Sequence, residues 1–162
     1  RSIGVNRTDF LSLIQMRPGM EKDCNILEWV AFASNAFNVL VPFYATIDTT
    51  PDYFSSTTRE VTTDSFYWVS RMIGAMADAS YSKSIFHIER YQERVMSKGH
   101  EYINQYDELL SKESDAEKRM QLRQEANQKI ADMVKKETQD TLNKVLYELS
   151  NQMKNAYSRS DA

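Results

Sequence analysis

Hydrophobic residues follow a strand-like pattern in the first part of the chain. In residues 10–16, apolar and polar residues partly alternate and partly form a short apolar run. The segment is followed by a Pro-Gly pair, which is a strong turn signal. Residues 26–33 and 38–44 are rich in aromatic and β-branched side chains, which favour strands. The pattern predicts two or three antiparallel strands, with Pro42 at an edge strand or a bulge because proline lacks the N–H that a central strand needs.

The pattern changes to helical spacing after a polar stretch. Residues 45–62 are rich in Thr, Ser and Asp, so we predict a loop there with room for one short helical turn. Apolar residues then recur every three or four positions up to about Tyr81. Thr62, Thr63 or Asp64 is predicted to cap the start of this helix.

Two longer helices are predicted in the second half, because all 4 Gly and all 3 Pro lie before residue 100. Ser84 is predicted to cap the first of them. Ser114 and Glu117 have the spacing of a capping box and are predicted to start the second, which would run to about Ala156. A short turn near Lys112 should fold the two helices into an antiparallel hairpin.

The composition is that of a globular domain. Of the 162 residues, 41% are hydrophobic and 27% are charged, which argues against wholesale disorder. The net charge of −3 provides no basic surface for nucleic acid. No apolar run is long enough to span a bilayer. We therefore expect neither a nucleic-acid partner nor a membrane partner.

The single cysteine and the two histidines are weak candidates for catalysis. Cys24 lies between Asp23 and Asn25, an acidic setting that would raise the pKa of its thiol, so we interpret it as a bystander. On one helix His87 and His100 would point about 140° apart, so they cannot share a metal. A Cys24–His pair would require a tertiary contact. We predict no metal site and no cofactor.

Two asparagines form a candidate polar site at the end of the second predicted strand. Asn35 and Asn38 flank Phe37, and an amide at a strand end can donate to an oxyanion or hold a substrate terminus. The simpler interpretation, which we favour, is that both amides satisfy the backbone of a turn. We keep Asn35 and Asn38 as candidate substrate-binding positions in a pocket wall.

Five segments in a fixed order point to a known family. They read R-S-I-G-V-N-R at 1–7, L-S-L-I-Q-M-R-P at 11–18, S-N-A-F-N-V-L-V-P-F-Y at 34–44, T-D-S-F-Y-W-V-S-R at 63–71 and I-E-R-Y-Q at 88–92. In this order they resemble the late part of the bacterial dipeptidase A family, cysteine peptidases of the N-terminal-nucleophile superfamily. The resemblance covers about residues 1–105, whereas residues 106–162 look like generic amphipathic helix.

The resemblance implies an αββα sandwich, in which two stacked sheets lie between helical layers. Residues 1–50 would be late antiparallel strands that complete one hydrolase sheet, and residues 51–162 a helical layer with a long antiparallel hairpin. The two segments together would make one partial domain. We therefore expect an α+β fold that is mostly helical by residue count.

The resemblance also implies hydrolysis of dipeptides through a thioester intermediate, without a metal or other cofactor. The family's nucleophile is a cysteine at the mature amino terminus, whereas this chain begins with Arg1. We therefore expect the carboxy-terminal portion of a cysteine dipeptidase, inactive alone, and assign it no catalytic residue.

The expected partners follow from that assignment. They are the dipeptide substrate in the whole enzyme and the amino-terminal part of the same protein, and a homo-oligomer is left open. A cytoplasmic location is expected, with secretion left open. The alternative function is a non-catalytic helical interaction module, because a hairpin with a wide apolar stripe suits partner binding.

Overall fold

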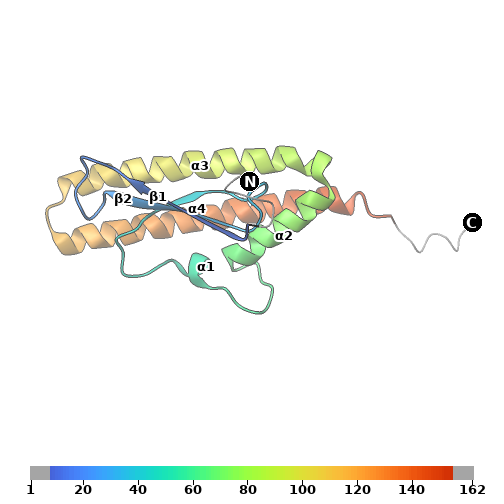
Figure 1. The fold of residues 1–162 in the computed structure, drawn as a ribbon, viewed down its shortest axis with the longest axis horizontal. Helices are drawn as coiled ribbons and strands as arrows, with labels where there is room; N and C mark the ends of the chain where they lie inside the picture. The colour runs from blue at the N-terminus through green and yellow to red at the C-terminus, as the bar shows by residue number, and fades with distance from the viewer. Residues whose placement is uncertain (1–7, 155–162) are drawn as a thin grey trace, which may run out of the picture.

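Strands precede helices along the chain in the computed structural model, which describes residues 8–154. The elements are β1 (Phe10–Met16), β2 (Ile26–Phe32), β3 (Val41–Tyr44), α1 (Asp52–Ser55), α2 (Phe66–Ala79), α3 (Tyr81–Lys112) and α4 (Ala116–Ser150). Figure 1 shows α3 and α4 side by side, with the sheet lying along them and α2 near one end. The predicted α+β class, mostly helical, is confirmed.

The strands form one antiparallel sheet in the order β1-β2-β3. β1 pairs with β2 over its full length, beginning with Phe10 opposite Phe32. β3 pairs with the other side of β2, where Pro42 lies opposite Trp29. Pro42 therefore lies on an edge strand, as predicted, and its missing N–H interrupts no central ladder.

Ser65 and Ser80 precede α2 and α3, and neither of the predicted caps is found there. The predicted cap at residues 62–64 is wrong, because the Thr62 hydroxyl accepts the Asp64 backbone N–H at 3.1 Å and forms a local turn ahead of α2. The predicted cap at Ser84 is also wrong. Ser84 lies buried in the first turn of α3, with its hydroxyl oxygen 2.6 Å from that of Ser80.

The start and end of α4 differ from the prediction in a similar way. Asp115, not Ser114, caps the helix, and its Oδ1 accepts the Lys118 backbone N–H at 2.9 Å. The helix also ends at residue 150. Met153, which belongs to the apolar stripe in the sequence, lies beyond that end and is exposed, so no other part of the described structure covers it. The predicted end at Ala156 lies outside the described residues.

β3 is the deepest element of the sheet, because all four of its residues are buried between α3 and α4. Asn127 of α4 pairs with the backbone of Tyr44 in the manner of a neighbouring strand. The Tyr44 N–H donates to Asn127 Oδ1 at 2.9 Å, and Asn127 Nδ2 donates to the Tyr44 carbonyl at 3.0 Å. Both backbone groups of this edge residue are therefore satisfied although they are buried.

The main core joins the sheet to the apolar stripes of the two long helices. Its fully buried members include Val41, Tyr44, Tyr91, Val95, Tyr106, Ile130 and Val134. Burial of this apolar surface is the main force that holds the sheet on the helices. Among the described residues, no helix combines the length and the apolar character needed to cross a membrane.

β1 is exposed on both of its faces. Leu13 and Ile14 are neighbours and so point to opposite sides of the sheet, yet they are 50% and 57% exposed. Phe10 and Met16 at the ends of the strand are 54% and 76% exposed. Within residues 8–154, β1 thus presents two apolar faces and an unpaired edge.

Gly99 allows α3 to lie directly against β3. A Cβ atom at this position would lie 2.9 Å from Cδ and 3.0 Å from Cγ of the Pro42 ring, closer than real Cβ atoms approach. Gly74 in α2 differs, because a Cβ there would lie 3.8 Å from the Phe37 ring, an ordinary van der Waals contact.

We expect Gly99→Ala to destabilise the protein by about 1–3 kcal/mol, because the rigid Pro42 ring cannot move aside without shifting β3. Urea unfolding followed by circular dichroism measures the change. Gly74→Ala is the matched control and should be neutral, or stabilising by up to about 1 kcal/mol through helix propensity. Equal stabilisation by both substitutions would show that the contact with Pro42 is not restrictive.

Candidate functional site

The turn that follows β2 contains a strained residue. Ala33 has a φ of 63°, and within residues 8–154 it is the single non-glycine residue with a positive φ. Such a conformation costs on the order of 1 kcal/mol and persists only where the surrounding contacts fix it. We call residues 33–38 the corner.

Backbone hydrogen bonds and one asparagine fix the corner. The Ala33 N–H donates to the Asp9 carbonyl at 2.8 Å, which ties the corner to the residue before β1. Asn38 is buried, and its Nδ2 donates to the carbonyls of Phe32 and Ala33 at 3.0 and 2.9 Å. The Asn38 amide therefore holds the strained backbone.

A side chain from α3 completes the corner. Gln92 Nε2 donates to the Asn38 carbonyl at 2.9 Å and to the Ala36 carbonyl at 3.5 Å. Because the Asn38 carbonyl is engaged by α3 in this way, β3 begins at Val41 rather than at the predicted residue 38. The corner is thus positioned by β1, β2 and α3 together.

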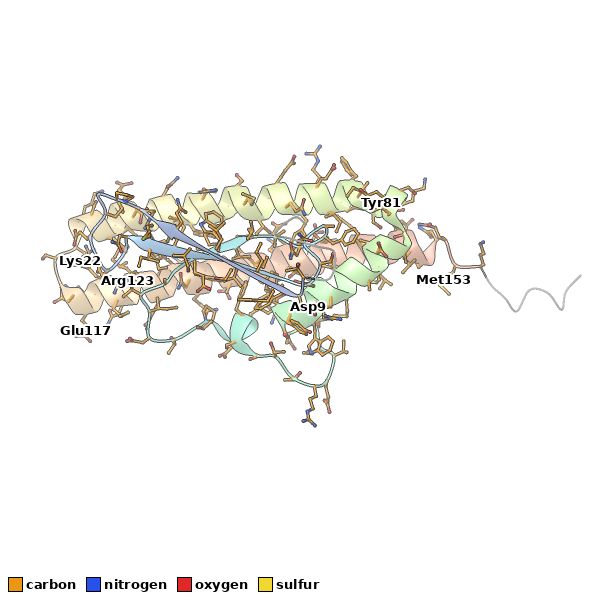
Figure 2. All side chains as sticks on the ribbon, in the orientation of Figure 1. Asp9, Lys22, Tyr81, Glu117, Arg123 and Met153 are labelled. Carbon is orange, nitrogen blue, oxygen red and sulfur yellow. The ribbon has the colours of Figure 1, made fainter. Side chains whose placement is uncertain are left out.

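A pocket of about 730 Å³ lies between the corner and α2. We call it the corner pocket; its lining residues are Asp9, Ala33, Ser34, Ala36, Phe37, Arg71, Gly74, Ala75, Asp78 and Tyr81. Figure 2 labels Asp9 at the start of β1, close to α2, and Tyr81 at the start of α3. The four lining residues from α2 have the spacing of one helix face, and the small pair Gly74 and Ala75 leaves a hollow in the middle of that face.

Both signs of charge line the corner pocket. Arg71 Nη1 donates to Asp9 Oδ1 at 2.7 Å, and the Arg71 guanidinium lies over the Tyr67 ring at 5.5 Å. Both members of this ion pair are exposed, so the pair contributes little to stability and can exchange partners. Asp78 has no ion-pair partner among the residues that the structure describes.

The structure places the two candidate asparagines in different environments. Asn38 directs its amide to the backbone of the corner, as the simpler interpretation expects. Asn35 is half-buried and lies between Ser34 and Ala36, which line the corner pocket, but neither Asn35 nor Asn38 is itself a lining residue.

Within residues 8–154, the hydrogen-bond contacts of the Cys24 sulfur include no histidine. It is 2% exposed, its Sγ donates to the Glu21 carbonyl at 3.5 Å, and Arg119 Nη2 approaches Sγ at 3.7 Å. Burial, and then the charge of Asp23, raise the pKa of the thiol, which disfavours the reactive thiolate.

The histidines make other contacts. His87 lies 3.5 Å from a carboxylate oxygen of Glu148, and the His100 ring packs on the Trp29 ring at 5.0 Å. Neither appears among the contacts of the buried thiol. Within residues 8–154, no three His, Cys, Asp or Glu side chains lie close enough to hold a metal ion.

A second polar cluster lies at the other end of the molecule, where Figure 2 labels Lys22, Arg123 and Glu117. Arg119 of α4 donates to both carboxylate oxygens of Asp23 at 2.8 and 2.7 Å, and Arg123 donates to one of them at 2.5 Å. The two arginine side chains are only 6% and 3% exposed. The cluster ties the connection between β1 and β2 to α4.

The same two arginines also cap backbone carbonyls. Arg123 donates to the Thr46 carbonyl at 2.9 Å, and Arg119 donates to the carbonyls of Leu110 and Glu113 at 2.5 and 3.1 Å. The hydrogen bond from Arg119 lowers the pKa of Asp23 to about 2, helped by the charge of Arg123 and opposed by burial. These contacts indicate a structural role for the cluster.

Comparison with known proteins identifies the family. The sequence profile of peptidase family C69 matches residues 1–94, more than half of the chain.

The chain belongs to peptidase family C69.

Similar proteins carry dipeptidase names. The chain is 40% identical over 163 residues to a "Probable dipeptidase A" of Streptococcus pyogenes serotype M18, and 33% identical over 198 residues to a "Dipeptidase" of Bifidobacterium longum. These matches cover 99% of this chain but 33% and 37% of those two proteins. The chain thus spans about a third of the length of the relatives it matches. The predicted resemblance to dipeptidase A is confirmed.

The likeness extends further along the chain than predicted. Residues 106–162 have a generic helical pattern, yet the alignments to these relatives cover 99% of the chain and so include most of α4. Two polar α4 side chains contact the strand part of the chain, Asn127 at Tyr44 of β3 and Arg123 at Thr46 just beyond β3, and an analysis of apolar periodicity does not detect them.

Three of the segments used to predict the family meet at the corner. Segment 34–44 forms the corner and β3, segment 63–71 brings Arg71 to the pocket, and segment 88–92 brings Gln92 to the corner carbonyls. All lining residues of the corner pocket lie within the part that matches the C69 profile. Segment 1–7 lies outside the described residues.

The roles of Arg71, Asp78 and Gln92 were not predicted from the sequence. Arg71 pairs with Asp9 across 62 positions of the chain, and Gln92 reaches Asn38 across 54 positions. No local pattern encodes contacts over such separations. The available signal was the presence of Arg71 and Gln92 within the family-like segments.

We expect Asp23→Asn to destabilise the protein by about 3 kcal/mol near pH 7, because it leaves two buried guanidinium groups without their shared counter-charge. Asp48→Asn, at an exposed position outside the cluster, is the matched control and should have little effect. Urea unfolding of both variants measures the difference.

The same cluster predicts a pH dependence. The pKa of Asp23 is about 2 in the folded chain, below the value of 3.8 for an unperturbed aspartate, so the ionised carboxylate stabilises the fold above about pH 4. This stabilisation should disappear as the pH falls from about 4 to about 2. The contribution should be missing from Asp23→Asn, and an identical loss of stability in both proteins over this window would contradict the assignment.

Proposed function

We propose that this chain is the carboxy-terminal portion of a cysteine dipeptidase of the N-terminal-nucleophile type, and that the attacking thiol lies outside this chain. Membership of peptidase family C69 and the dipeptidase names of the relatives support the proposal. The observation that carries it is the convergence of three family-like segments on one pocket with a strained backbone.

The proposed reaction needs a thiol beside a base. A terminal amine would accept the thiol proton, the thiolate would attack the peptide carbonyl, and the C–N bond would break as the second amino acid leaves with that proton. Water would then hydrolyse the thioester. Cys24 does not suit this role, because it lies inside the chain and burial raises the pKa of its thiol. It is also the single cysteine of the chain.

The proposed partner is the amino-terminal part of the same enzyme. β1 presents apolar side chains on both faces and an unpaired edge, which is the surface that another strand or sheet covers. In the proposed αββα sandwich, the strands described here would continue one sheet and the helices would form an outer layer, so that the chain acts as one partial domain.

The alternative, a non-catalytic helical interaction module, has less support. Such a module would need the apolar stripe of the α3–α4 pair to be free for a partner. In this structure β3 and α2 already cover that stripe, and Tyr91, Val95, Ile130 and Val134 on it are buried.

The test is assembly of the enzyme from two chains. We expect neither this chain nor a separately produced amino-terminal portion to hydrolyse L-alanyl-L-alanine, and their mixture to do so. Cys24→Ser should leave the activity of the mixture unchanged. Ile14→Lys should weaken assembly, because it places a charge on the exposed face of β1.

Hydrolysis by this chain alone, abolished by Cys24→Ser, would show that the nucleophile lies here after all. Absence of hydrolysis from a stably assembled mixture would reject the dipeptidase assignment.

We further propose that Asn35 binds substrate, whereas Asn38 acts mainly by holding the corner. Asn38→Ala should cost about 2 kcal/mol of stability, because it leaves two corner carbonyls without donors. Asn35→Ala should lower kcat/KM of the assembled enzyme at least about tenfold with little change in stability. Equal loss of stability in both variants, with no separate effect of Asn35→Ala on kcat/KM, would contradict this division.

A further inference from the structure

The corner pocket presents two opposite charges at a fixed spacing. Arg71 and Asp78 lie seven residues apart on the same face of α2, which places them two turns, or about 10 Å, apart along the helix axis. Gly74 and Ala75 between them have almost no side chain, so a ligand can lie along the helix surface between the two charged groups.

Each charge is available to a ligand. Arg71 directs Nη1 to Asp9 and to the Tyr67 hydroxyl, and within residues 8–154 no contact engages its Nη2 or Nε, which leaves two donors for a carboxylate. Asp78 lies in the last turn of α2 and has no ion-pair partner among the described residues. The negative end of the helix dipole also favours a cation there.

The spacing suits a short ligand that carries a charged group at each end. A dipeptide separates its ammonium and carboxylate groups by about 7 Å, since an extended chain advances about 3.5 Å per residue. That length is shorter than the distance of about 10 Å between the two helix positions, so a dipeptide fits between the two charged side chains.

The remaining walls suit the body of such a ligand. The Phe37 and Tyr81 rings pack edge to face with centroids 6.2 Å apart and form an apolar side of the pocket. The strained backbone at Ala33 directs the next residue, Ser34, toward the same space. An apolar substrate side chain can rest on the rings while the backbone groups face the corner.

We propose that the corner pocket binds a dipeptide as a zwitterion, with its carboxylate at Arg71 and its ammonium group at Asp78. The choice of ligand rests on the proposed dipeptidase function. The pocket recognises both free ends of the ligand at once, through charge rather than through an enclosing wall.

The first test measures binding to the 162-residue chain by ¹⁵N NMR, with L-alanyl-L-alanine as the probe. Saturable shifts are expected for the amides of Ser34, Ala36 and Ala75. The N-acetylated and the carboxamide forms of the probe should each bind at least about tenfold more weakly, because each lacks one charge.

The second test uses matched variants. Asp78→Asn, Arg71→Gln and Ala75→Leu should each weaken binding at least about tenfold, the last by filling the hollow without changing a charge. The controls are Glu89→Gln, Arg59→Gln and Ala79→Leu, at exposed positions outside the pocket, and they should bind as the unmodified chain does. Arg71→Lys should restore part of the affinity lost in Arg71→Gln.

Absence of saturable shifts at the corner, or equal binding of the blocked and free dipeptides, would overturn the proposed site. If the assembled enzyme nevertheless hydrolysed dipeptides, the pocket would be rejected and the dipeptidase function would stand. Binding with the expected charge dependence, but without hydrolysis by the assembled enzyme, would support the pocket and reject the catalytic assignment.

Discussion

The burial of β3 between α3 and α4 is the constraint on which the rest of the structure depends. A four-residue strand can be buried only if its backbone finds partners, and Asn127 supplies them for Tyr44. With β3 fixed, β2 and β1 follow by pairing, and Gly99 lets α3 close over the Pro42 ring. The corner lies directly before β3, so its position is set by the same packing.

The elements were predictable from the sequence where local chemistry decides them. Alternation in residues 10–16 and β-branched and aromatic content in residues 26–33 are local signals, and both strands are found there. The predicted helix caps at Ser84 and Ser114 were wrong because several neighbouring Ser, Thr and Asp residues can each cap a helix. Tertiary packing determines which of them does.

The candidate site was predictable only in part, since its chemistry is assembled over long distances. Asn35 and Asn38 could be placed at a strand end from the sequence, but the strain at Ala33 depends on contacts within the corner, and the approach of Arg71 depends on how α2 packs. The buried pair Arg119 and Arg123 shows the same limitation. From the sequence alone, a charged residue on a helix is predicted to face solvent. The structure shows instead that the connection between β1 and β2 packs against these two arginines.

Because the Cys24 sulfur is buried, its chemical reactivity can report local unfolding without any added label. With 2% of the residue exposed and an arginine beside Sγ, alkylating reagents can reach it only when the connection between β1 and β2 lifts away from α4. The rate of modification therefore reports local unfolding of that end of the molecule. No engineered label is required, because the chain carries no second thiol to obscure the signal.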